Sequence, residues 1–155
     1  MQFGGRYLLA APRRKVWEAL NDVEVLKAAI PGCRRIEWTG PTTLELEIKV
    51  DLGPVHPVFT GDLDLSDVVP AARYRLSGRG RGGLLGLAHG GADILLADSE
   101  MGTELRFIAE GGASGQLMRL GKALIGGSAQ AVIDGFFERF ATAMGVEIVP
   151  LAPAA

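Results

Sequence analysis

The sequence predicts an α+β fold in which a curved antiparallel sheet wraps around one long C-terminal helix. Segments of alternating apolar and polar residues fill the middle of the chain, and an apolar helical pattern runs over residues 115–144. Alternation with a period of two is typical of antiparallel strands that have one buried and one wetted face. A length of 155 residues fits one domain, and the 48% hydrophobic content supplies a core.

Residues 3–9 predict the first strand, which ends near Pro12 because proline donates no hydrogen bond to a ladder. Two short helices are expected next. The first carries an apolar stripe at helical spacing, formed by Val16, Trp17 and Leu20. Residues 21–22 suit the N-cap of the second helix, and Pro31-Gly32 ends it.

The clearest strand covers residues 44–52, where leucine, isoleucine and valine alternate with glutamate, lysine and aspartate. Further alternating segments cover residues 59–66, 73–81, 92–96 and 105–110. Along one of them, the inward positions change from the bulky Tyr74 and Leu76 to Gly78 and Gly80. Glycines on the concave face permit a sheet to bend and leave volume for a guest.

Residues 115–144 would form a helix of about 45 Å at the usual rise per residue, weakened at Gly126-Gly127. Small residues on this helix and glycines in the sheet predict an apolar cavity between the two layers. The segment 146–155, rich in proline and alanine, reads as a flexible C-terminal tail. The expected organisation is therefore one domain over residues 1–145 followed by that tail.

The charge balance excludes a general attraction to nucleic acid or anionic lipid, since the net charge is −2. The single cysteine, Cys33, excludes an internal disulfide and fits a reducing compartment. We find no signal peptide pattern, and no stretch approaches the roughly 20 apolar residues of a membrane span.

The sequence shows no catalytic or metal-binding cluster. His56, His89 and Cys33 are far apart in sequence, so we expect no metal site. Cys33 would need a base to act as a nucleophile, and we interpret it as a packed small residue. The glycine-rich segment 78–83 lacks the lysine of a phosphate loop and the aromatic residues that stack nucleotides.

The candidate ligand-binding residues are inward apolar positions near the glycines and the first helices. Leu26 and Ile30 are expected at the entrance. The expected wall residues are Phe59, Tyr74, Leu76, Ile94, Phe107, Leu120, Leu124 and Phe136. Solid core is the alternative for each, because cores and apolar pockets share composition. Arg75, Arg79 and Arg81 alternate onto the outer face, either as solvated charges or as a docking patch for an acidic protein or lipid headgroups.

Several segments together resemble the family of the carbon monoxide dehydrogenase G-subunit, which lies within the START-like helix-grip superfamily. The resemblance extends from Met1 to about Gly145, and the sequence Ile30-Pro31-Gly32-Cys33 is its most specific part. The other matching segments are Val16–Asp22, Leu26–Ala29 directly before that sequence, Lys49–Val55, Phe59–Gly61, Leu76–Gly80 with Gly86 and Gly90, Gly115–Gly121 and Phe136–Phe137.

The resemblance implies a START-like helix-grip domain with about seven strands, a cavity, and no catalytic residues to carry over. It implies a molybdenum-containing, aerobic-type carbon monoxide dehydrogenase or related molybdenum hydroxylase as partner. It also implies no intrinsic cofactor, and a bound menaquinone or other quinone or lipid. The expected location is cytoplasmic, either free or peripheral at the cytoplasmic face of the inner membrane. Some relatives carry a long C-terminal membrane-seeking extension, whereas here only residues 146–155 follow the domain.

The sequence therefore leaves three alternative functions open. The first is a non-enzymatic carrier of an apolar ligand that links the dehydrogenase to the membrane or to its electron acceptor. The second is a pure protein-docking adaptor whose cavity is incidental. The third is a cyclase- or aromatase-like enzyme, which would need a buried acid–base pair in the cavity.

Overall fold

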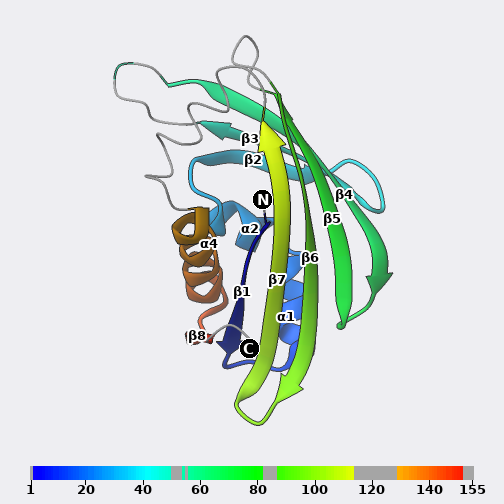
Figure 1. The fold of residues 1–155 in the computed structure, drawn as a ribbon, viewed down its shortest axis with the longest axis vertical. Helices are drawn as coiled ribbons and strands as arrows, with labels where there is room; N and C mark the ends of the chain where they lie inside the picture. Colours follow the sequence, from blue (N-terminus) through cyan, green and yellow to red (C-terminus); the bar gives the residue numbers. More distant parts are fainter. Residues whose placement is uncertain (1, 50–53, 55, 82–86, 114–128, 152–155) are drawn as a thin grey trace.

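The computed structural model describes residues 2–49, 54, 56–81, 87–113 and 129–151. Its strands are β1 Gln2–Leu9, β2 Cys33–Trp38, β3 Thr43–Lys49, β4 Val58–Val69, β5 Arg73–Arg81, β6 Leu87–Ser99, β7 Gly102–Ala113 and β8 Ile148–Leu151. The helices are α1 Arg13–Leu20, α2 Val23–Ala29 and α4 Ala129–Met144 (Figure 1).

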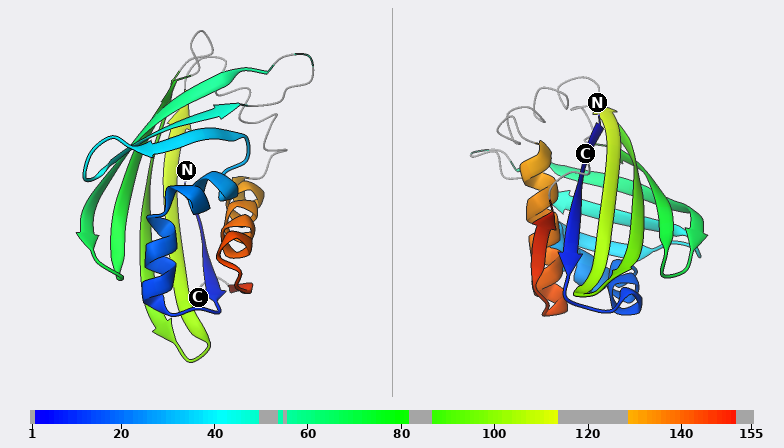
Figure 2. Two further views of the ribbon diagram at one scale, coloured as in Figure 1. Left: turned by 180° about the vertical axis from the view of Figure 1, so that it is seen from behind. Right: turned by 60° about the horizontal axis from the view of Figure 1, so that its bottom comes forward.

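The strands form one sheet in the order β2-β3-β4-β5-β6-β7-β1-β8, and every neighbouring pair is antiparallel. The sheet curves so that α1, α2 and α4 lie on its concave side, with α4 beside β1 (Figures 1 and 2). The predicted α+β class is therefore confirmed, with eight strands in place of about seven.

Two strands differ from the sequence prediction. The sequence does not predict β2, because only Ile36 is buried in it and no apolar alternation marks it. Residues 148–151 are expected within a flexible tail, yet they form β8 and pair with residues 6–9 of β1. Pro150 fits there because β8 is an edge strand, where a missing N–H group costs little.

The two predicted short helices are present, and the turn after α2 holds them against the sheet. The Asp22 carboxylate accepts a hydrogen bond from the Glu24 backbone N–H at 2.9 Å and caps α2. Gly32 has a φ of +72°, and its carbonyl oxygen accepts a hydrogen bond from the Lys49 N–H at 2.9 Å. A Cβ atom at Gly32 would collide with the Lys49 carbonyl oxygen. The turn therefore requires glycine and fixes α2 beside the end of β3.

Helix α4 is fixed to the sheet and to α2 by polar contacts at both sides. The Tyr7 hydroxyl of β1 donates to the Asp134 carboxylate at 2.5 Å, and Arg139 Nε donates to the Ala29 carbonyl oxygen at 2.9 Å. The rings of Tyr7 and Phe137 pack with centroids 4.6 Å apart. The predicted helix begins at residue 115, and residues 114–128, including Gly126-Gly127, lie outside the described residues.

The described core is divided into two groups. The larger group packs α1 and α4 against β1, β6 and β7, and its fully buried members include Tyr7, Leu9, Leu105, Phe137 and Phe140. The smaller group lies on β2 and β3 and consists of Ile36, Leu44 and Leu46, with partly buried residues of α2 and β4 packed against it. The candidate site is bordered by members of both groups.

Candidate ligand-binding site

An apolar cavity of about 260 Å³ is bordered by both core groups. Helices α1, α2 and α4 contribute to one side of it, and strands β2 to β7 contribute to the other. Its lining residues are Leu20, Leu26, Ile30, Ile36, Leu44, Leu63, Leu65, Tyr74, Leu76, Ile94, Phe107, Ile133, Phe136 and Phe137. Small-molecule sites are usually concave and mostly apolar, with a few polar groups.

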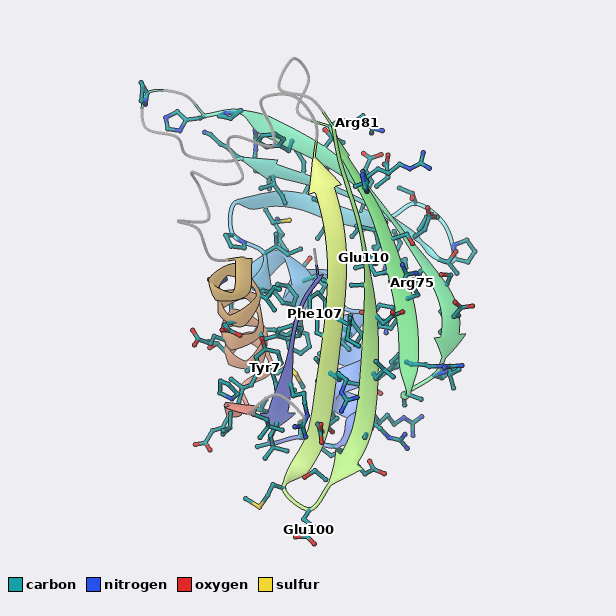
Figure 3. All side chains as sticks on the ribbon, in the orientation of Figure 1. Tyr7, Arg75, Arg81, Glu100, Phe107 and Glu110 are labelled. Carbon is teal, nitrogen blue, oxygen red and sulfur yellow. The ribbon has the colours of Figure 1, made fainter. Side chains whose placement is uncertain are left out.

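Sheet register places the wall residues side by side. Tyr74 pairs with Ile94, which pairs with Phe107, so one inward row crosses β5, β6 and β7 (Figure 3 labels Phe107). On the opposite side, Leu26 and Ile30 are four residues apart at the end of α2, a spacing that puts both on one helix face. The Gly32 turn holds this face over the cavity.

A wider groove of about 360 Å³ adjoins the cavity and shares Leu63 and Leu76 with it. The groove is bordered by glycine and alanine positions of β4 to β7, namely Gly61, Gly78, Gly80, Gly90, Gly91, Ala92 and Ala109. Gly61 pairs with Gly80, and Gly78 pairs with Gly90, so positions without a side chain are adjacent across the strands. The predicted change from bulky to glycine along β5 thus marks where the cavity opens into the groove.

Tyr74 is the one polar side chain among the described residues that line the cavity. Its side chain is 6% exposed, and its ring packs edge-to-face against Trp17 of α1 with centroids 5.4 Å apart. Burial raises the pKa of the Tyr74 hydroxyl well above its usual value. The hydroxyl therefore stays protonated at any physiological pH.

The structure places seven of the ten predicted ligand-binding residues around this cavity: Leu26, Ile30, Tyr74, Leu76, Ile94, Phe107 and Phe136. Phe59 lies opposite Ile48, two positions beyond Gly61 on β4, and borders neither the cavity nor the groove. Leu120 and Leu124 lie outside the described residues. Whether any of these residues binds a ligand stays a prediction.

Half of the lining residues were not selected from the sequence: Leu20, Ile36, Leu44, Leu63, Leu65, Ile133 and Phe137. Alternation already placed Leu44, Leu63 and Leu65 on the inward face. Periodicity identifies the buried face, but it does not show which buried residues meet a neighbour and which border a gap.

The predicted arginine patch, Arg75, Arg79 and Arg81, lies at alternate positions of β5 that point away from the cavity (Figure 3 labels Arg75 and Arg81). Arg75 makes ion pairs with Asp93 at 3.0 Å and with Glu110 at 3.1 Å, and Arg81 pairs with Asp62 at 2.8 Å. Exposed pairs of this kind contribute little to stability. They do reduce the positive charge that Arg75 and Arg81 offer to a partner, whereas Arg79 is exposed and has no such pair among the described residues.

The remaining candidate groups show no catalytic arrangement in the part of the chain that the structure describes. No group of three histidine, cysteine, aspartate or glutamate side chains there could hold a metal ion. The Cys33 thiol donates to the Arg35 carbonyl oxygen at 3.5 Å, and burial raises its pKa, which opposes a role as nucleophile. The Tyr7–Asp134 pair joins β1 to α4, but neither residue lines the cavity.

Within the described residues, no helix is both long and apolar enough to cross a membrane.

Solved structures with the same fold share little sequence with this chain. A conserved protein from Geobacillus kaustophilus has a TM-score of 0.80 and 22% identity, with 96% of this chain and 99% of that chain covered. A protein from Chromobacterium violaceum has a TM-score of 0.67 and 16% identity, with 91% of this chain and 95% of that chain covered. The Zhui aromatase/cyclase from Streptomyces sp. R1128 has a TM-score of 0.62 and 13% identity, covering 94% of each chain. These likenesses establish the helix-grip fold alone.

Among curated proteins, none matches the sequence significantly. The family model for the carbon monoxide dehydrogenase G-subunit (CoxG) matches residues 5–145, which include every described helix and most of the described sheet. The match covers nearly all of the region in which we noted the resemblance. The chain is a member of the CoxG family.

Proposed function

We propose that this protein is a non-enzymatic carrier that holds an apolar ligand, a quinone or other lipid, in the cavity between its sheet and helices. The observation that carries the proposal is the cavity itself. Fourteen described residues line it, thirteen of them with apolar side chains, and it continues into a groove bordered largely by glycine and alanine. Apolar surface that borders empty space loses packing contacts, so a greasy occupant would regain them.

We further propose that the carrier associates with a molybdenum-containing carbon monoxide dehydrogenase-type enzyme and links it to the membrane or its electron acceptor. Support comes from membership in the CoxG family. Of the three outer arginines, Arg79 is the best candidate contact for an acidic partner surface, because Arg75 and Arg81 are paired within the sheet. In a pull-down of the dehydrogenase, Arg79→Glu should weaken capture more than Arg81→Glu does. If both variants and the wild type capture the dehydrogenase equally, the arginine patch is not the contact surface.

The carrier proposal is tested by extracting purified protein under denaturing conditions and identifying the extracted lipids by mass spectrometry. A quinone or another lipid should be recovered in stoichiometric amount. Added naphthoquinones should also raise the melting temperature, since a ligand that binds only the folded state stabilises it. If no lipid is recovered and no analogue changes the melting temperature, the carrier proposal is wrong.

A blocking variant sharpens this test. Leu63 borders both the cavity and the groove, so Leu63→Trp should fill the passage between them and abolish lipid recovery. Overpacking is expected to cost about 1–3 kcal/mol of unfolding free energy. The matched control is Leu95→Trp on β6, where the side chain is 37% exposed on the outer face. Recovery equal in the two variants would place the lipid elsewhere.

The enzyme alternative receives less support from the described residues. Cyclase chemistry requires a positioned acid or base, and Tyr74 is the one titratable side chain on the described cavity lining. Its raised pKa disfavours the anion that a base would need. The likeness to an aromatase/cyclase concerns the fold, which does not determine activity.

A further inference from the structure

The Tyr74 hydroxyl stands apart from the other buried tyrosine hydroxyl of the core. Tyr7 donates its hydrogen bond to Asp134, whereas the Tyr74 hydroxyl makes no hydrogen bond to any group of the described structure. The Tyr74 side chain is nevertheless more than nine-tenths buried. Buried tyrosine hydroxyls usually find a partner, so this exception calls for an explanation.

The hydroxyl borders open space. Among the described residues, no fully enclosed side-chain nitrogen or oxygen atom lacks a hydrogen-bond partner. The Tyr74 oxygen, which has no partner among the described residues, is therefore not fully enclosed by protein atoms. The strand alternation that sends Arg73 and Arg75 outward sends Tyr74 inward, and the inward void that it borders is the apolar cavity.

We propose that the Tyr74 hydroxyl is the polar recognition point of the cavity and donates a hydrogen bond to an oxygen atom of the ligand. This inference rests on the proposed carrier function and narrows it. The preferred occupant is an apolar molecule that carries a carbonyl oxygen, as a quinone or a ketone does. A pure hydrocarbon would leave the Tyr74 hydroxyl without a partner. A ligand with an oxygen atom at this point therefore binds more tightly than a hydrocarbon of the same shape.

The position of Tyr74 also orients the ligand. Along β5, Tyr74 and Leu76 border the cavity, and Leu76, Gly78 and Gly80 border the groove. Six residues of extended strand separate Tyr74 from Gly80, which corresponds to about 20 Å. The oxygen-bearing ring therefore lies innermost at Tyr74, and a hydrocarbon tail leaves over the glycine positions.

The test compares two ligands of the same shape in two proteins. The ligands are 2,3-dimethyl-1,4-naphthoquinone and 2,3-dimethylnaphthalene, which lacks the oxygens; the two methyl groups also block addition of the Cys33 thiol to the quinone ring. Dissociation constants are measured by equilibrium dialysis with the wild type and with Tyr74→Phe. We expect the variant to bind the quinone roughly three- to tenfold more weakly, the effect of one net hydrogen bond, and to bind the hydrocarbon at least as well as the wild type.

Tyr7→Phe is the control, since it removes a tyrosine hydroxyl that does not line the cavity. Any effect that it has through α4 should change both dissociation constants by the same factor and leave their ratio unchanged. Tyr74→Phe should also be at least as stable as the wild type, because the hydroxyl loses no partner. If Tyr74→Phe binds the quinone as tightly as the wild type, this inference is wrong while the carrier function stands. If the wild type binds neither compound, both the inference and the carrier function fail.

Discussion

Gly32 provides a stringent test of how the turn after α2 is built. In Gly32→Ala, the new Cβ atom would collide with the Lys49 carbonyl oxygen, and the backbone φ of +72° is itself unfavourable for alanine. Gly145 has a nearly identical φ of +73°, but an added Cβ there meets no atom within 4 Å. The two variants therefore share the conformational cost and differ only in the collision.

The left-handed conformation costs alanine about 1–2 kcal/mol, and this is the loss of unfolding free energy expected for Gly145→Ala. Displacing packed backbone adds an overpacking cost of typically about 1–3 kcal/mol. For Gly32→Ala we therefore expect a total loss of about 2–5 kcal/mol. In a domain of this size, each kcal/mol lowers the melting temperature by roughly 2–4 °C.

Urea unfolding followed by circular dichroism measures both losses, provided that the slope with denaturant is unchanged. Gly32→Ala should also weaken quinone binding, because Ile30 lies two residues before the turn and lines the cavity. Equal destabilisation by the two variants would show that Gly32 is not pressed against Lys49. The account of how α2 is held over the cavity would then be wrong.

Three further predictions concern the groove, the Tyr7–Asp134 hydrogen bond that joins β1 to α4, and the pH dependence of stability. Gly61 borders the groove but not the cavity, so Gly61→Leu should weaken binding of a quinone that has an isoprenoid tail and should not weaken binding of the ring without a tail. The control, Ser77→Leu on the outer face of β5, should affect the binding of neither ligand. If Gly61→Leu weakens the binding of both ligands equally, the proposed orientation is wrong. Tyr7→Phe should lower the unfolding free energy by about 1.5–3 kcal/mol in urea titrations, the range for a hydrogen bond to a charged group, and an unchanged value would mean that Asp134 does not hold β1 to α4. The hydrogen bond from Arg6 lowers the pKa of Glu104, so its stabilisation is present above the unfolded pKa of about 4.3 and is lost as the pH falls through the lower folded value. Glu104→Gln should therefore be less stable than the wild type at pH 7, by an amount that salt reduces, and the difference should shrink as the pH falls below about 4.3. A difference that stays constant as the pH is lowered further would contradict this assignment.

The strands and helices with strong patterns were predictable because local physics specifies them. The alternation in residues 44–49 and the cap at Asp22 were visible in the sequence, and both are present in the structure. Strands β2 and β8 were missed because each lies at an edge of the sheet, where one-sided burial leaves a weak pattern. Their pairing depends on the neighbouring strand rather than on their own residues.

For the candidate site, the sequence identified the inward face and the change from Tyr74 and Leu76 to glycine, but not the gap. Phe59 shows the limit: it continues the inward alternation of β4, yet it lies beyond the end of the groove. A cavity exists where two packed groups fail to meet, and this depends on the curvature of the whole sheet and on the position of α4. Neither quantity is local in the sequence.

The amino-acid sequence alone thus determined the class of fold, the apolar character of its interior and the positions without side chains, because these follow from residue type and period. The tertiary structure decided which inward residues border the cavity, which outer arginines are already paired, and that the Tyr74 hydroxyl has no hydrogen-bond partner among the described residues. These are relations between residues far apart in the chain, and only the folded arrangement brings such residues together or holds them apart.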